Sequence, residues 1–186
     1  MTIFFTNNFN NAKGESHELL AKAIATYTGL MAEPFIERME IGELGKPAIE
    51  GLDDFSISHS RNTWAVIFDI NPCGLDVQEH RDIKIDNISA RWFHEDEVKY
   101  LASVDESNKK TEFFRIWARR EALVKSVGTS IVNSHLPCTI RDEVRFEGQS
   151  WHLADVTIPG ADEMSSAVCC KEISDIEFIE IGGSNA

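Results

Sequence analysis

The sequence lacks the features of a membrane-spanning or secreted protein. None of its apolar runs approaches the roughly 18 residues that cross a bilayer. Residues 1–5 are apolar, but no basic residue precedes them and no long apolar segment follows, which argues against a signal peptide. Hydrophobic residues make up 42% and charged residues 26% of the 186, as in ordinary globular proteins. We therefore expect a cytoplasmic protein with no membrane partner.

Metal-binding cysteine motifs and basic runs are also missing. The four cysteines form no CxxC pair and no His/Cys cluster with zinc-finger spacing, so reduced thiols are expected. The net charge is −13, and the sequence contains no basic run. Because nucleic-acid binders usually present a basic face, nucleic acid is not expected as a partner.

The pattern of apolar and polar residues predicts a mixed α and β protein. Strands are expected at 2–6, 34–41, 55–58, 63–70 and 75–77, and near 139–146, 151–157 and 166–180. Helices are expected at 15–28, 86–93, 95–103 and 111–127, with a polar loop at 105–110. Ser16 is a candidate N-cap for the first helix, and Gly29 a candidate stop.

Hairpin-like strand pairs separated by helices favour an α+β fold over a doubly wound sheet. The turn at 71–74 divides the chain into a shorter half at 1–71 and a longer half at 72–181. The remaining residues, 182–186, are expected to form a flexible tail.

The helix at 111–127 carries two charged residues in unexpected positions. At about 100° per residue, its polar stripe contains Glu112, Arg115, Arg119 and Ser126. Glu121 and Lys125 lie outside this stripe, on the apolar side. Their i, i+4 spacing also suits an ordinary surface ion pair. Buried charges tend to be paired, metal-bound or catalytic, so both interpretations stay open.

Asp76 is a second candidate carboxylate, flanked by Leu75 and Val77 after a turn. An isolated aspartate at a strand edge often serves as a cap or turn residue. Magnesium, however, prefers one or two carboxylates together with phosphate oxygens and water. Asp76 and Glu121 could supply this pair, with Lys125 neutralising the phosphate beside them.

Two weaker motifs precede these residues. The segment from Phe55 to Ser60 reads Phe-Ser-Ile-Ser-His-Ser and offers hydroxyls and an imidazole at the end of a strand. Lys46 and Pro47 follow Gly45 in a turn. Either motif alone is also compatible with a purely structural role.

Together, and in this order, the four motifs resemble the surfactin-synthetase type of 4'-phosphopantetheinyl transferase. The matching segments are Gly45-Lys46-Pro47, Phe55–Ser60, Gly74–Val77 and Phe114–Gly128, and the segment Arg91–Glu97 is similar to a linking helix of that family. The resemblance covers about residues 45–131.

The resemblance implies two similar α+β halves packed as a pseudo-dimer, with coenzyme A bound between them. It implies transfer of the phosphopantetheine arm to a serine of an apo acyl, peptidyl or aryl carrier protein in fatty-acid, polyketide or nonribosomal peptide synthesis. The other product is 3',5'-adenosine bisphosphate. The expected enzyme is a magnesium-dependent monomer, with manganese as an alternative metal.

The same resemblance implies the site residues. Asp76, Glu121 and Lys125 would be catalytic, with the metal held by Asp76 and Glu121. Coenzyme A would contact Lys125 and four further residues: Lys46, Pro47, Ser58 and His59. Gln78 stands where the family commonly has a glutamate, so we expect it to be a neutral or outer metal ligand.

Two other functions remain open. Gln78 and the short first half are also compatible with a coenzyme A or carrier-protein binding module that has lost turnover. The same residues would also suit a magnesium-dependent pyrophosphate hydrolase.

Overall fold

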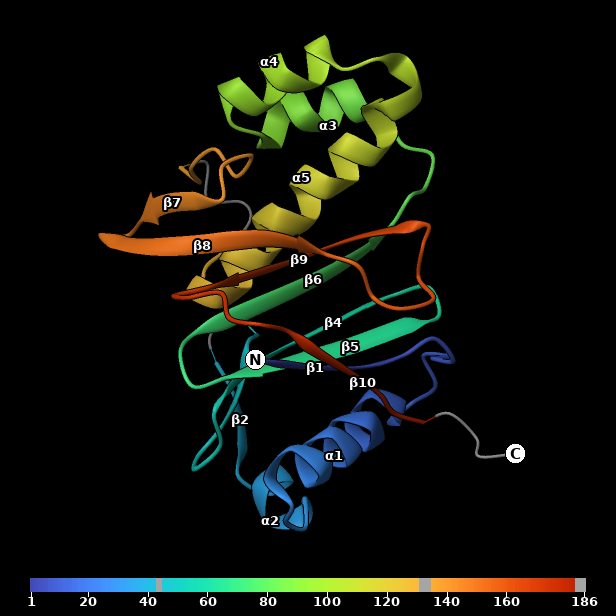
Figure 1. Ribbon diagram of the computed structural model, residues 1–186, viewed down its shortest axis with the longest axis vertical. Helices are drawn as coiled ribbons and strands as arrows, with labels where there is room; N and C mark the ends of the chain where they lie inside the picture. Colours follow the sequence, from blue (N-terminus) through green and yellow to red (C-terminus); the bar gives the residue numbers. More distant parts are fainter. Residues whose placement is uncertain (43–44, 131–134, 183–186) are drawn as a thin grey trace.

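Two four-stranded sheets are stacked between helices in the computed structural model, which describes residues 1–42, 45–130 and 135–182 (Figure 1). The first sheet has the order β10-β1-β5-β4, and its strands are β1 (Thr2–Thr6), β4 (Asp54–Ser60), β5 (Thr63–Asp69) and β10 (Glu177–Glu180). Its outer face packs against α1 (Glu15–Thr28) and α2 (Glu33–Ile36). A separate antiparallel pair is formed by β2 (Met39–Ile41) and β3 (Pro47–Ile49).

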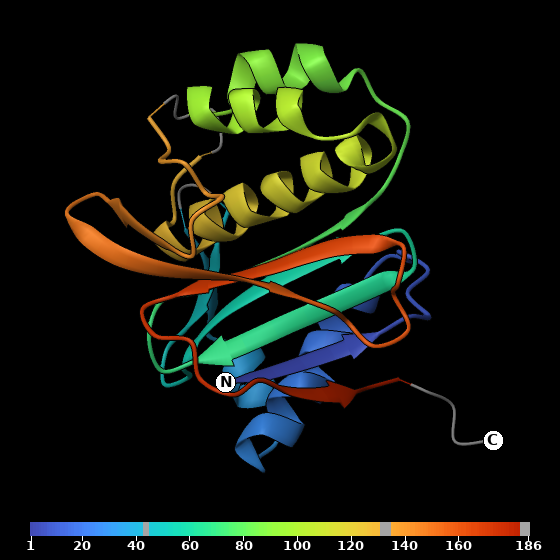
Figure 2. The ribbon, with the colours of Figure 1, turned by 45° about the horizontal axis from the view of Figure 1, so that its top comes forward.

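The second sheet has the order β6-β9-β8-β7 and is antiparallel throughout. Its strands are β6 (Cys73–Glu79), β7 (Glu143–Phe146), β8 (Gln149–Val156) and β9 (Met164–Cys170). The long helix α5 (Glu106–Val127) covers the outer face of this sheet (Figure 2). Two shorter helices, α3 (Ile85–Trp92) and α4 (Glu95–Ser103), pack at the N-terminal end of α5.

The inner faces of the two sheets pack against each other. Ile3, Phe5 and Ile67 from the first sheet meet Leu75 and Val168 from the second, and all five are almost fully buried. The alternate residues of the first sheet, such as Phe4 and Trp64, point to α1. Strand periodicity therefore produces a four-layer helix–sheet–sheet–helix stack, which confirms the α+β class.

A row of three serines joins the two sheets along their adjacent edges. Ser56, Ser58 and Ser60 alternate along β4, so their side chains share one face. Their hydroxyl oxygens accept hydrogen bonds from the backbone N–H groups of Leu75, Val77 and Glu79 on β6, at 3.0–3.1 Å. The serine row thus satisfies backbone donors of β6 that would otherwise be left at a buried sheet edge.

Gly74 allows α5 to approach β6 closely. A Cβ atom at this position would lie 2.0 Å from the carbonyl oxygen of Ala122 and 2.6 Å from Ser126 Oγ. Real Cβ atoms do not tolerate such distances, so only glycine fits. The close approach brings the C-terminal half of α5, with Glu121 and Lys125, next to Asp76 on β6.

Several predicted elements are confirmed, including the strand at 2–6 and the helices at 15–28 and 95–103. The strand predicted at 34–41 is confirmed only at its end, where residues 39–41 form β2, because residues 33–36 form α2 with Pro34 in its first turn, where proline is tolerated. The loop predicted at 105–110 is also wrong, because α5 already begins at Glu106. The segment predicted as one strand at 166–180 is divided between β9 and β10, which lie in different sheets.

Two details of the helices also differ from expectation. Gly14, not Ser16, is the N-cap of α1, and the Ser16 hydroxyl instead accepts a hydrogen bond from the Trp64 indole at 2.8 Å. The polar stripe of α5 does not face solvent throughout, because Arg119 and Ser126 are buried and hydrogen-bonded to neighbouring backbone.

The division of the chain at residue 71 stays a prediction. The second sheet and α5 belong wholly to residues 72–181, whereas β10 pairs in parallel with β1 in the first sheet. Of the predicted tail at 182–186, residues 183–186 lie outside the described residues. Within the described ranges, no helix has the length and apolarity needed to cross a membrane.

Candidate active site

Asp76 is a buried carboxylate held by three side chains. It lies in the middle of β6 with 3% of its surface exposed. Its Oδ1 atom accepts hydrogen bonds from the Ser58 hydroxyl at 2.9 Å and from the Lys125 ammonium at 2.7 Å. Its Oδ2 atom accepts one from the Gln78 amide at 2.7 Å. A buried charge needs such partners, and these donors fix the orientation of the carboxylate.

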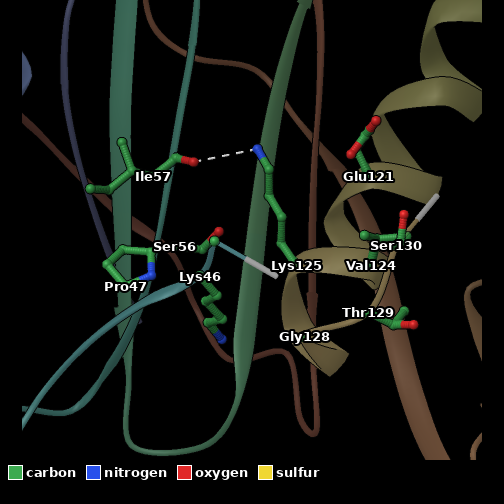
Figure 3. Close-up of a pocket in the computed structure, with 11 residues that line it drawn as sticks. Lys46, Pro47, Ser56, Ile57, Glu121, Val124, Lys125, Gly128, Thr129 and Ser130 are labelled. Carbon is green, nitrogen blue, oxygen red and sulfur yellow. Dashed lines mark hydrogen bonds between the residues drawn. The ribbon is translucent and has the colours of Figure 1, made fainter. Parts of the chain in front are cut away.

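Lys125 links α5 to both sheets. Its ammonium donates to Asp76 Oδ1, to the Leu75 carbonyl oxygen at 3.0 Å and to the Ile57 carbonyl oxygen at 3.3 Å. Figure 3 shows the side chain extending from α5 toward Ile57 on β4. An ammonium group has three N–H donors, so these three acceptors satisfy it fully. A phosphate oxygen binding here would replace one of them.

Glu121 lies one helical turn before Lys125 and is half-buried. Burial raises its pKa above the ordinary range, and the Asp76 charge raises it further, while Lys125 and Arg120 act in the opposite direction. In the part of the chain that the structure describes, no hydrogen bond reaches its carboxylate. Glu121 therefore offers an acceptor that is poised to take up a proton or a cation.

A cavity of about 340 Å³ lies between the first half of the chain and α5 (Figure 3). One side is formed by Lys46, Pro47, Ser56 and Ile57. The other side is formed by Glu121, Val124 and Lys125, together with the residues after the helix, Gly128, Thr129 and Ser130. The cavity is thus lined by both a carboxylate and an ammonium group, and its walls come from segments on either side of residue 71.

The structure brings most of the predicted site residues together. Ser58 and Gln78 contact Asp76 behind the cavity, and Lys46 and Pro47 line the cavity itself. His59 is exposed, does not line the cavity, and its ring lies 5.0 Å from that of Phe9.

The Lys46 ammonium donates hydrogen bonds to Asp54 Oδ2 at 2.6 Å and to the Cys73 carbonyl oxygen at 3.1 Å. These contacts connect the turn that was predicted to contact coenzyme A to β4 and to the start of β6.

Thr129 and Ser130 were not predicted as site residues. They follow Gly128, which ends α5 in the left-handed conformation and turns the chain along the cavity. Their position directly after the helix stop was the only sequence signal for them. Ser56 belongs to the Phe55–Ser60 motif, but its place in the cavity wall depends on the pairing of the sheets.

The carboxylates meet the requirements of a hard divalent cation. From the residues that the structure describes, Asp76 Oδ2 accepts a single hydrogen bond and retains a lone pair, and the Glu121 carboxylate lines the cavity. Oxygen donors of this kind suit Mg²⁺ better than softer metals. The amide oxygen of Gln78 becomes available only if its amide turns away from the present contact with Asp76.

Two acidic side chains and an ammonium group beside a cavity define a site of the kind that binds a metal–phosphate group. A sequence model of the 4'-phosphopantetheinyl transferase superfamily matches residues 72–166, just over half of the chain. This segment includes Asp76, Glu121 and Lys125. The chain belongs to this superfamily.

Several bacterial proteins are similar to the chain. It is 31% identical over 96 residues to 4'-phosphopantetheinyl transferase Sfp of Bacillus subtilis (strain 168), covering 50% of this chain and 42% of that protein. It is 27% identical over 140 residues to 4'-phosphopantetheinyl transferase gsp of Aneurinibacillus migulanus, covering 67% and 58%. It is 29% identical over 147 residues to 4'-phosphopantetheinyl transferase psf-1 of Bacillus pumilus, covering 74% and 62%. The chain therefore spans about half the length of these relatives.

Proposed function

We propose that the chain transfers the 4'-phosphopantetheine arm of coenzyme A to a serine of an apo acyl, peptidyl or aryl carrier protein. The observation that carries the proposal is the cavity lined by Glu121 and Lys125, with Asp76 buried behind Lys125. The names of the relatives, all 4'-phosphopantetheinyl transferases, support the same reaction.

In the proposed reaction the carrier serine oxygen attacks the phosphorus atom that bears the pantetheine arm. The bond from this phosphorus to the bridging pyrophosphate oxygen breaks, and 3',5'-adenosine bisphosphate leaves. Glu121, which lines the cavity, accepts the serine proton, directly or through a water. Lys125 exchanges a backbone acceptor for a phosphate oxygen and can protonate the leaving group.

We further propose that Asp76 and Glu121 hold Mg²⁺, or Mn²⁺ in its place, with Gln78 as a neutral ligand. When bound, the metal neutralises charge on the pyrophosphate. Lys46 and Pro47 would contact the nucleotide from the opposite wall of the cavity. His59 would contact a coenzyme A phosphate from its exposed position on β4, and Ser58 would contribute by orienting Asp76.

The proposed setting is the cytoplasm, where the protein would act as a monomer. The four cysteines are all free thiols and all buried, which suits a reducing compartment.

The proposal is tested by incubating the protein with coenzyme A, Mg²⁺ and several apo carrier proteins, and then measuring the mass of each carrier. We expect at least one carrier to gain one phosphopantetheine per chain, and Asp76→Ala and Glu121→Ala to abolish the gain while keeping the far-UV spectrum of the folded protein. No gain on any carrier would refute the transferase. Coenzyme A binding without transfer would instead identify a binding module, and phosphopantetheine release without a carrier would identify a hydrolase.

A further inference from the structure

A second group of metal-ligating side chains lies away from the proposed active site. His94, Asp96 and Cys138 each offer one ligand atom, and the three atoms lie within 4.8 Å of one another. They line a cavity of about 500 Å³, and among the described residues this cavity shares no lining residue with the cavity of Glu121 and Lys125. His94 and Asp96 are at the N-terminal end of α4, and Cys138 is on the segment that leads to β7.

We propose that His94, Asp96 and Cys138 bind a borderline-soft divalent cation of the Zn²⁺ type. One imidazole, one carboxylate and one thiolate form a mixed set of donors that Zn²⁺ accepts and Mg²⁺ does not favour. His94 Nδ1 and Asp96 Oδ2 lie 3.8 Å apart. Donors around a tetrahedral ion with bonds of about 2.0–2.3 Å are separated by roughly 3.5 Å, so small side-chain movements would complete the site.

Buried hydrogen bonds already fix the two segments that carry these ligands. Glu97, next to Asp96, is fully buried, and its Oε1 atom accepts from the backbone N–H of Thr139 at 2.7 Å and from its hydroxyl at 2.8 Å. Thr139 follows Cys138 directly. The Oε2 atom of Glu97 accepts from the backbone N–H of His94 at 2.8 Å. All three proposed ligands therefore flank a common anchor, which lowers the entropy lost on binding a metal.

The surroundings leave room for a fourth ligand. Glu143 lines the same cavity but is not among the side chains whose ligand atoms lie within 4.8 Å of one another, so a water molecule would occupy this position. Three protein ligands with an open fourth position are typical of exchangeable or catalytic zinc sites rather than closed structural ones. Arg141 lines the cavity too, so its positive charge offsets part of the negative charge of the donors.

Metal binding would change the cap of α4. His94 Nδ1 accepts a hydrogen bond from the Asp96 backbone N–H at 3.2 Å. A metal on Nδ1 would take up this lone pair, and a metal on Nε2 would require the proton on Nδ1, which then cannot accept. In either case the backbone N–H of Asp96 loses its partner, and the helix end becomes a reporter of metal binding that is independent of catalysis.

The test uses the full chain after treatment with chelator and reductant, titrated with Co²⁺ as a spectroscopic probe and with Zn²⁺ in competition. We expect one Co²⁺ with thiolate-to-metal charge-transfer absorption, which Zn²⁺ displaces and Cys138→Ser abolishes. His94→Ser and Asp96→Asn should each weaken binding roughly tenfold or more. His94→Ser retains a side-chain oxygen that can cap α4, so this variant should fold. It therefore tests the proposal even if Cys138→Ser fails to fold.

Matched variants separate this site from other binding. His17→Ala, which removes an exposed histidine on α1, should leave Co²⁺ and Zn²⁺ binding unchanged. Glu121→Gln should also retain the charge-transfer band, because it alters only the carboxylate site. In the wild type, metal should shift the amide resonance of Asp96. A charge-transfer band that persists in Cys138→Ser, or equal Zn²⁺ affinity in wild type and His94→Ser, would overturn the proposal.

Discussion

Ser58 and Asp76 connect the adjacent edges of the two sheets. The Ser58 hydroxyl on β4 donates to Asp76 Oδ1 at 2.9 Å, while its oxygen accepts from the backbone N–H of Val77 at 3.1 Å. Both contacts are buried, and Asp76 is also the partner of Lys125. The orientation of the buried carboxylate in the site therefore depends on the packing of the first sheet against the second.

Ser58→Ala should lower the free energy of unfolding by about 1–3 kcal/mol, because it leaves a buried carboxylate and a buried backbone N–H each short of one partner. Ser60→Ala is the matched control, since Ser60 accepts from the Glu79 N–H in the same way but is partly exposed. Urea unfolding of both variants measures the difference. Equal losses in the two would show that the contact with Asp76 contributes nothing.

Gly74→Ala should prevent α5 from packing closely against β6. The new Cβ would lie 2.0 Å from the Ala122 carbonyl oxygen, and helix backbone cannot yield as a flexible side chain does. We expect a loss of about 3 kcal/mol or more in unfolding free energy, together with loss of activity.

Gly148→Ala serves as the control for this change. Gly148 has φ +76°, and among the described residues no atom lies within 4 Å of the place that a Cβ would occupy. Gly148→Ala should therefore lower the free energy of unfolding by about 1–2 kcal/mol, because alanine disfavours the left-handed backbone at this position. If thermal unfolding showed the two variants to be equally stable, the close approach at Gly74 would have no energetic importance.

Local patterns in the sequence predicted much of the fold, whereas contacts between distant segments could not be predicted. The helix at 15–28 followed from its apolar spacing and from Gly29, whose left-handed conformation ends it. The start of α5 was missed because Lys109 and Lys110 make residues 105–110 look like a solvated loop. In the structure they pair with Asp86 and Asp82, which are distant in sequence.

The same distinction holds for the site. The spacing of Glu121 and Lys125 on one helix indicated a shared location, and Asp76 followed from the resemblance to a known family. The contacts of Asp76 with Ser58 and Lys125 depend on sheet packing, which one-dimensional periodicity does not contain. The sequence does not predict the group formed by His94, Asp96 and Cys138. Cys138 is far from the other two in sequence, so zinc-finger spacing does not apply.

Glu97→Ala should destabilise the protein strongly. The Glu97 carboxylate is fully buried and accepts hydrogen bonds from His94, Arg120 and Thr139, with Arg120 Nη1 at 2.7 Å. Removing it leaves the buried Arg120 guanidinium without its counter-charge, a change that typically costs about 3–5 kcal/mol. Glu95→Ala is the control on the same helix, because Glu95 is exposed and forms an i, i+4 pair with Lys99. Chemical denaturation should show no appreciable change for Glu95→Ala; comparable losses would contradict the anchoring role of Glu97.

Glu121 should make the stability of the metal-free protein depend on pH. Burial, followed by the Asp76 charge, raises the pKa of Glu121 in the folded state above its unfolded value. Between these two values the folded protein binds more protons than the unfolded one, so stability falls as pH rises through this window. Glu121→Gln removes the contribution. We expect the stability of the variant relative to wild type to increase from acidic pH toward neutrality.

This dependence is measured by urea unfolding at a series of pH values, in chelator. Glu112→Gln is a suitable control because Glu112 lies on the same helix but is hydrogen-bonded to Arg115 and Tyr100. Glu121, by contrast, is affected by the negative charge of Asp76. Parallel pH profiles for wild type and Glu121→Gln would be inconsistent with a raised Glu121 pKa.

Gln78→Glu should increase the dependence of the protein on a divalent cation. The Gln78 amide donates to Asp76 Oδ2 at 2.7 Å, so it now supplies a hydrogen bond where the family commonly has a carboxylate. Glutamate would remove this donor and add a second negative charge next to Asp76, which destabilises the metal-free protein and strengthens binding of a hard cation. We expect a lower melting temperature in chelator and a larger rise on addition of Mg²⁺ than in wild type. Glu79→Gln, on the opposite face of β6, should alter neither quantity, and an unchanged Mg²⁺ response in Gln78→Glu would place the metal away from Asp76.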